Sequence, residues 1–186
     1  MTFSELTTPG GYKIGEVSSA MQKCIRRGLE EDALFWATEL DLAGYGEYVF
    51  KRLRIIASED VGLAEAIAAP TIYALYQNWL AQRKKKDEKH GPERLFLVHA
   101  VLILSRAAKS CTVDHALIAM YEASRPERAI PDFALDKHTS AGRKLRRAWK
   151  HFWEHGARLE NKAQLHDPYE ATARATRIDR QREFDL

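Results

Sequence analysis

Apolar residues recur along most of this chain at the three- and four-residue spacing of amphipathic helices. The clearest face ends at Gly44 and consists of Ala33, Trp36, Ala37 and Leu40. Comparable spacing predicts further helices over about residues 17–28, 45–57, 70–83, 95–104, 113–121 and 140–161. No segment alternates apolar and polar residues between hairpin-type turns, so strands are not required. The predicted fold class is all-α, with about seven helices.

The helical pattern predicts one domain over residues 16–162. A chain of 186 residues, 45% of them apolar, is long enough for one sizeable core and too short for two comfortable ones. Residues 1–15 contain Thr-Thr-Pro-Gly-Gly, which is typical of a flexible N-terminal arm. Residues 163–186 are predicted to form a charged C-terminal tail or a peripheral helix.

The two cysteines indicate no special chemistry. Cys24 and Cys111 lie far apart, without a C-x-x-C pair or zinc-type histidine spacing, so neither a disulfide framework nor a structural zinc is indicated. The longest apolar run, residues 95–104, is interrupted by His99 and is too short to span a bilayer. The first residues lack a secretory signal pattern. We therefore expect a cytoplasmic protein with reduced thiols, no cofactor and no membrane partner.

Basic residues are concentrated between positions 137 and 162. Eight basic residues against two acidic ones give this segment a net charge of +6, whereas the whole chain carries only +3. On one continuous helix, the outer face would carry Arg143, Arg147, Lys150 and Arg158. Such a strip suits contact with a phosphate backbone or an acidic protein. Simple solvation of the helix explains it equally well.

The same predicted helix contains the spacing H-x-x-E-H at His151, Glu154 and His155, as in inverted zinc peptidases. On a helical wheel the predicted buried stripe consists of Leu145, Trp149, Phe152, Gly156 and Leu159. The two histidines flank this stripe and Glu154 faces away from it. A hydrolytic zinc needs an enclosed site with a third protein ligand. A zinc hydrolase is therefore a remote alternative, and no metal site is predicted.

Residues 18–64 closely resemble the start of the C-terminal helical domain of the RarA/MgsA family of AAA+ ATPases, which are associated with replication and recombination. The matching positions are Ser19, Lys23 and Arg26, then Ala33, Leu34 and Trp36, then Ile56-Ala57-Ser58-Glu59-Asp60-Val61-Gly62. Further on, Ala107-Ala108-Lys109-Ser110 stands where that family has a small-residue Pro-Lys-Ser turn. The resemblance covers about residues 17–124 and becomes weak from residue 131.

The resemblance implies an all-α fold of the clamp-loader-collar type. It also implies the oligomerisation module that builds a homotetramer in complete ATPases of the family, here without the ATPase modules. The chain contains no G-x-x-x-x-G-K-[ST] phosphate loop, so no ATP hydrolysis and no catalytic residue is expected.

We therefore expect a non-catalytic oligomerisation or adaptor domain of DNA replication, recombination or repair. Its expected partners are copies of itself, an AAA+ ATPase, and DNA or a DNA-bound protein. The alternative is an independent DNA-binding protein that uses the basic helix over residues 140–161.

Acidic residues cluster at the end of the third predicted helix, where they oppose the helix dipole and need a local reason. Asp60 or Ser58 can cap the next turn, Gly62 can adopt a left-handed conformation, and Arg52 or Arg54 can supply a counter-charge. We predict a structural role here, with contact to a partner as the alternative. The family pattern marks these structural or interface positions: Lys23, Arg26, Trp36, Arg52, Ser58, Glu59, Asp60, Gly62, Lys109 and Ser110.

Overall fold

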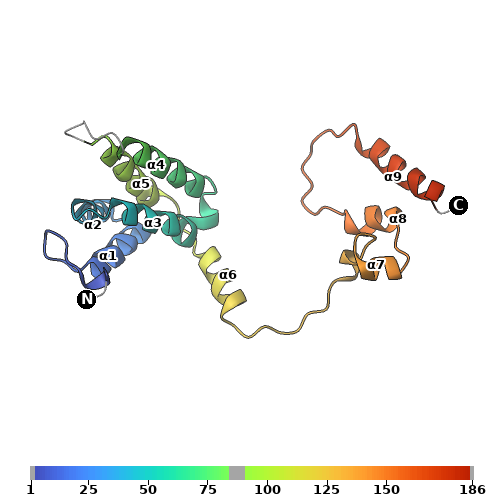
Figure 1. Cartoon of the computed structure of the whole chain (residues 1–186), viewed down its shortest axis with the longest axis horizontal. Helices are drawn as coiled ribbons and strands as arrows, with labels where there is room; N and C mark the ends of the chain where they lie inside the picture. Colours follow the sequence, from blue (N-terminus) through green and yellow to red (C-terminus); the bar gives the residue numbers. More distant parts are fainter. Residues whose placement is uncertain (1–2, 84–90, 185–186) are drawn as a thin grey trace. The chain divides into compact units, whose positions relative to one another are not determined.

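The computed structural model describes residues 3–83 and 91–184, and within these ranges it contains helices and no strand (Figure 1). The predicted all-α class is confirmed. Contacts divide the chain into two compact units, Met1–Arg125 and Pro126–Leu186. The boundary falls inside the range 16–162, for which the sequence predicts a single domain. It lies in a stretch, residues 121–131, whose residues are all exposed and therefore add nothing to a core.

The first unit contains the six helices that the hydrophobic pattern predicts for it. Within the described residues they are α1 (Ile14–Arg27), α2 (Glu30–Leu42), α3 (Gly46–Ile56), α4 (Ala68–Arg83), α5 (Glu93–Arg106) and α6 (Thr112–Tyr121). The first helix begins three residues before the predicted start at Val17, because Ile14 is completely buried and belongs to the core. None of the described helices has the length and apolar content that crossing a bilayer requires.

Helix α5 lies at the centre of this unit and contacts α1, α2, α3 and α4. Its inward residues Leu97, Ala100, Val101 and Leu104 are buried, as expected for the apolar segment 95–104. Leu95, at the start of that segment, is instead exposed. Burying each large side chain contributes roughly 1.5–3 kcal/mol. Because α1 to α5 all supply such residues to one cluster, the hydrophobic effect holds them together.

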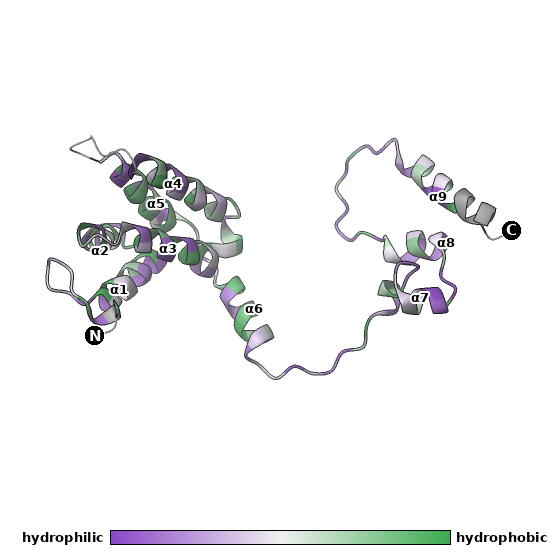
Figure 2. Cartoon of the chain, in the orientation of Figure 1, coloured by the Kyte–Doolittle hydropathy of each residue, from purple (hydrophilic) through white to green (hydrophobic). Residues whose placement is uncertain are grey.

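Helix α6 differs from the other five helices of the first unit in having no buried residue. It is nevertheless rich in apolar residues, which appear green in Figure 2. Leu117, Ile118, Met120 and Tyr121 are between 44% and 76% exposed. This helix therefore packs against the rest of its unit only at its edge.

The N-terminal segment contacts the helical body, although the sequence predicts a flexible arm there. Phe3, in a short 3₁₀ helix (Phe3–Glu5), packs edge-on against the rings of Tyr45 and Tyr48, with centroids 5.2 and 5.0 Å away. Thr8 is buried, and its hydroxyl donates a hydrogen bond to the Glu39 carboxylate at 2.7 Å. The ring of Phe3 and the hydroxyl of Thr8 thus attach the N-terminal segment to the helices of the first unit.

The second unit corrects the prediction of one helix over residues 140–161. The chain forms α7 (Ser140–Lys144), a turn, and α8 (Trp149–His151), which continues as a π-helical turn, Phe152–Gly156. Arg146 has a left-handed φ of 55°, and the amides of Arg146 and Arg147 donate to the carbonyls of Arg143 and Gly142. This Schellman arrangement ends α7. Leu145 and Leu159 are consequently exposed and form no buried stripe.

The C-terminal segment, predicted as a tail or a peripheral helix, contains α9 (Glu170–Phe184). Its Arg174 lies over the ring of Trp153 at 5.1 Å, which is a cation–π contact within the second unit. Trp153 also stacks near Trp149 at 6.3 Å. The second unit is thus held by aromatic rings and arginines, with far fewer buried residues than the first unit.

Two adjacent residues of α3 offer a test of the core boundary. Ile56 is completely buried, whereas Ile55 is 39% exposed. We expect Ile56→Ala to lower the free energy of unfolding by about 2–5 kcal/mol because it opens a cavity. Measured at a protein concentration at which the chain is monomeric, Ile55→Ala should change it by less than about 1 kcal/mol. Urea unfolding of both variants, followed by circular dichroism, measures the difference; equal losses would contradict this description of the core.

Candidate functional site

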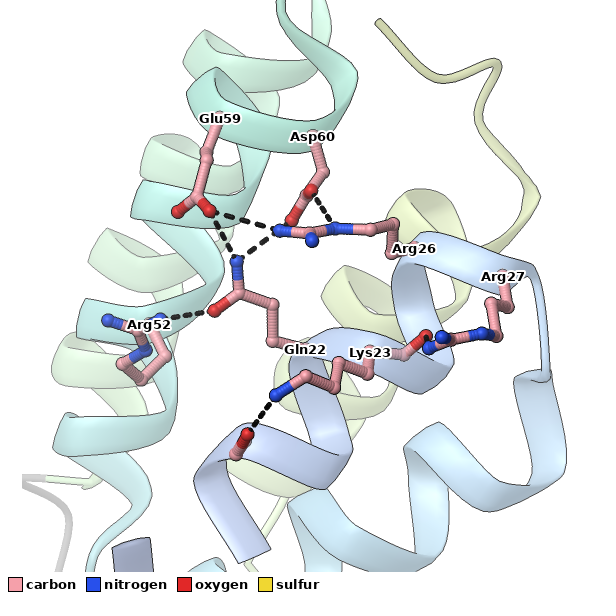
Figure 3. A network of polar contacts seen from close by, with 8 residues as sticks. Gln22, Lys23, Arg26, Arg27, Arg52, Glu59 and Asp60 are labelled. Carbon is pink, nitrogen blue, oxygen red and sulfur yellow. Dashed lines mark hydrogen bonds and ion pairs between the residues drawn. The ribbon is translucent and has the colours of Figure 1, made fainter. Parts of the chain in front are cut away.

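Two acidic residues of the π-helical turn after α3, Ala57–Val61, bind two side chains of α1 (Figure 3). Asp60 is completely buried and accepts hydrogen bonds from the Gln22 amide, at 3.1 Å, and from the Arg26 guanidinium. Glu59 accepts from the same two groups at 2.9 and 3.0 Å. Arg52 of α3 donates to the Gln22 amide oxygen. These five residues form one network, here called the Asp60 network, which joins α1 to α3.

The Asp60 network contains a positive charge that balances the acidic pair Glu59 and Asp60. A buried carboxylate without partners would cost several kcal/mol. Arg26 supplies the positive charge, and its hydrogen bond to Asp60 raises the pKa of the guanidinium. The sequence predicts Arg52 or Arg54 in this role; Arg52 acts only through Gln22, and Arg54 instead lies over the rings of Tyr73 and Tyr76. No capping hydrogen bond from Ser58 or Asp60 starts the following turn.

The Lys109–Ser110 turn contacts the backbone of the same region. The Ser110 amide donates to the Asp60 carbonyl at 2.8 Å. Gly62 has a positive φ of 48° but a ψ of −122°, so it does not adopt the left-handed helical conformation that the sequence suggests; a Cβ placed there would lie 3.1 Å from the Ser110 carbonyl oxygen. The Lys109 ammonium donates to the carbonyls of Ser105 and Ala107, and burial lowers its pKa. The segments around Asp60 and Lys109 therefore form one contiguous structure.

Three other positions marked by the family pattern lie outside the Asp60 network. The Lys23 ammonium donates to the Ser19 hydroxyl one turn earlier on α1. Trp36 packs edge-on against Tyr12 and Phe35, with ring centroids 5.2 and 4.8 Å away. Ser58 is exposed and lines a groove. Trp36 is partly buried against the hydrophobic core, and none of these three residues belongs to the buried polar cluster.

An open groove of about 950 Å³, here called the α6 groove, separates α6 from α3 and α4. Its apolar lining includes Ile55 of α3, Tyr73 of α4, and Val113 and Leu117 of α6. Lys51 and Arg54 supply positive charge on the α3 side. The groove is not predictable from the hydrophobic pattern of the chain. Its only signal is the apolar face of α6, which looks the same whether it covers a core or a partner.

The four predicted contact residues of the second unit do not form one strip. Arg147 is only 17% exposed and donates to the carbonyls of Asp132 and Leu135 at 2.6 and 2.8 Å. Its guanidinium also pairs with the Asp132 carboxylate, whose pKa it lowers. Because α7 ends at Lys144, Arg147 lies on no helix shared with the others.

The remaining three residues of the predicted strip stay exposed. Arg143 donates to the carbonyl of His138 at 3.2 Å. Lys150 and Arg158 are 80% and 74% exposed and lie 4.0 and 3.1 Å from the carboxylates of Glu154 and Glu160. Nearby acids thus offset part of the positive charge that the sequence places here.

The H-x-x-E-H spacing brings the rings of His151 and His155 to 4.8 Å between centroids. The carboxylate of Glu154 lies 4.0 Å from the Lys150 ammonium. In the part of the chain that the structure describes, no group of three or more histidine, cysteine, aspartate or glutamate side chains could hold a metal ion. The geometry therefore gives the zinc alternative no support.

Comparison with known proteins relates both units to one family. The family model described as MgsA AAA+ ATPase C terminal matches residues 29–178. The match begins after Lys23 and Arg26 and continues far beyond residue 131, where the resemblance described above becomes weak. It therefore includes most of the second unit.

Two curated relatives carry the name replication-associated recombination protein A. The Bacillus subtilis protein is 32% identical over 145 residues, which are 75% of this chain and 32% of that protein. The Haemophilus influenzae protein is 29% identical over 129 residues, which are 69% of this chain and 27% of that protein. The chain thus spans about a third of the length of these relatives.

The Arg26–Asp60 contact is suited to a double-mutant cycle. We expect Arg26→Met and Asp60→Asn to show a coupling of about 1–3 kcal/mol in the free energy of unfolding, because the carboxylate is buried. Arg26 is 41% exposed, and solvent screening keeps the value below that of a fully buried pair. The control pair is Arg106–Glu30, both more exposed than Asp60, where the coupling should be far smaller. Equal couplings would contradict a special role for Asp60.

Arg147 and Lys150 should behave differently when each is replaced by alanine. Arg147→Ala removes the hydrogen bonds to the loop around Asp132 and should speed amide hydrogen exchange around α7. Lys150→Ala removes an exposed side chain and should leave exchange unchanged. Hydrogen exchange with mass spectrometry compares them. If hydrogen exchange is unchanged in the Arg147 variant, Arg147 does not stabilise the loop and is better described as an exposed contact residue, as the sequence predicts.

Proposed function

This chain belongs to the family of MgsA AAA+ ATPase C-terminal domains, and from that premise we propose that it is a non-catalytic oligomerisation and adaptor domain. Its proposed setting is DNA replication, recombination or repair, since both relatives are named replication-associated recombination protein. Such a role places the chain in the cytoplasm. Its proposed assembly is a homo-oligomer, a tetramer by family resemblance.

The observation that carries this proposal is the exposed apolar face of α6. An isolated helix of ten residues is marginal in water, and most helices gain their stability from packing an apolar face. Within the first unit the face of α6 remains uncovered, with Leu117 and Tyr121 51% and 76% exposed. Contiguous exposed apolar surface marks protein interaction sites. A protein partner is therefore the natural cover for α6.

The Asp60 network supports a non-catalytic role. A carboxylate that activates water needs a free lone pair facing a substrate, whereas the buried Asp60 carboxylate is bound by Gln22 and Arg26. Glu59 is bound by the same two groups. The printed sequence also contains no phosphate-binding loop of the G-x-x-x-x-G-K-[ST] type. These residues stabilise the fold and leave no acid pair for hydrolysis.

The adaptor role follows from the shared domain. A domain that associates with its own copies can also associate with the same domain of a longer relative, because the interacting surfaces are alike. We therefore propose that this chain joins oligomers of a RarA/MgsA-type AAA+ ATPase.

Light scattering across micromolar concentrations tests self-association of the purified chain. We expect a mass that is a multiple of 21.3 kDa, because burial of the α6 face favours assembly. The chain should also elute with a full-length ATPase of this family and not with a form lacking the matched domain, which is the control. If the chain is a monomer and does not elute with the full-length ATPase, the proposal is contradicted. A monomer that binds duplex DNA at low salt would instead favour the DNA-binding alternative, through Lys150 and Arg158.

A further inference from the structure

The α6 groove is an apolar surface that the rest of the first unit leaves uncovered. Ile55, Tyr73 and Leu117 are 39%, 52% and 51% exposed along it. Helix α6 does not close onto α3 because its start is anchored: the Ser110 amide is bonded to the Asp60 carbonyl, and Val113 lies against Gly62. The opening is therefore preformed and has the apolar lining that suits a helix.

The two sides of the α6 groove differ in charge. Lys51 and Arg54 lie on the α3 side, and among the described residues neither has a carboxylate within ion-pair distance. Helix α6 carries Asp114 and no lysine or arginine, and exposed Glu122 follows it directly. Glu59 also lines the groove but is already bound by Gln22 and Arg26. An apolar helix with acidic residues is thus the complement of the α3 side.

The helix that fits this description is α6 itself. Each copy carries one α6 and one groove, so a twofold axis can bring each helix to the other copy's groove and bury both apolar faces at once. The acids of each α6 would then meet the bases of the other copy's α3. A small-molecule ligand in the groove would leave most of the apolar face of α6 uncovered.

We propose that two copies of this chain associate by reciprocal placement of α6 in the partner copy's α6 groove, with Asp114 and Glu122 paired with Lys51 and Arg54. This inference rests on the proposed self-association and names the surface that carries it. The apolar residues supply the stabilisation, while the charges select the orientation of the helix.

Charge exchange between two variants tests this arrangement. Lys51→Glu with Arg54→Glu makes the groove acidic, and Asp114→Lys with Glu122→Lys makes α6 basic. Each variant alone places like charges together and should weaken self-association roughly tenfold or more. A mixture of the two variants restores opposite charges at both reciprocal contacts and should associate nearly as tightly as the unchanged chain. Sedimentation equilibrium measures all three.

Control variants separate this surface from general effects of charge. Glu16→Lys with Glu31→Lys raises the net charge as much as the α6 variant does, but at exposed positions of α1 and α2, and should leave association unchanged. Leu117→Asp places one charge on the apolar side of α6 and should abolish association. Because Leu117 is half exposed, the helical circular dichroism of that variant should match the unchanged chain, so loss of folding is distinguished from loss of contact.

The outcomes distinguish this inference from the proposed function. If the unchanged chain is monomeric, the proposed self-association fails and this inference fails with it. If the unchanged chain assembles but the charge variants and Leu117→Asp assemble equally well, only the α6 exchange is wrong and another surface carries the assembly. If the charge variants weaken assembly and their mixture does no better, the paired charges do not lie on different copies, which also overturns the exchange.

Discussion

The carboxylate of Asp60 is buried where α1 meets the end of α3, and two donors one helical turn apart on α1, Gln22 and Arg26, must both reach it. This requirement fixes the rotation and the register of α1 against α3, because a shift of one residue would leave a buried charge without partners. The backbone carbonyl of Asp60 also accepts from Ser110. One residue therefore links the first helix of the unit to the segment that starts α6.

That link explains how α6 stays exposed. A helix with such an apolar face would bury more surface by collapsing onto α3 and α4. The π-helical turn at Ala57–Val61 and the positive φ of Gly62 instead direct the chain so that Val113 lies against Gly62 and Leu117 faces an open groove. The link from the polar cluster to α6 therefore runs through the backbone carbonyl of Asp60, and none of the five side chains belongs to α6.

The helices of the first unit agree closely with those predicted from the hydrophobic pattern, because residues near the helix ends signal where the helices stop. Gly28 ends α1 with a φ of 71°, and glycine favours that conformation. Arg146 ends α7 with the same kind of hydrogen bonds, but an arginine gives no such signal in the sequence. The contacts of Arg147 with the loop around Asp132 are distant in sequence and help to fix this turn. A helical wheel assumes one continuous helix, so it gives wrong faces for the residues on the two sides of Arg146.

The polar site was predictable in kind and not in detail. The paired acids indicate that a base must lie nearby, but which base depends on how α1 packs, and Arg26 lies 34 residues away from Asp60. The exposed face of α6 has a related cause. Helical periodicity shows that Leu117 and Tyr121 need a cover, and it is silent on whether that cover comes from the same chain. Because the Asp60 carbonyl accepts from the Ser110 amide just before α6, changes at Asp60 should also shift α6, and with it the groove proposed to bind a second copy.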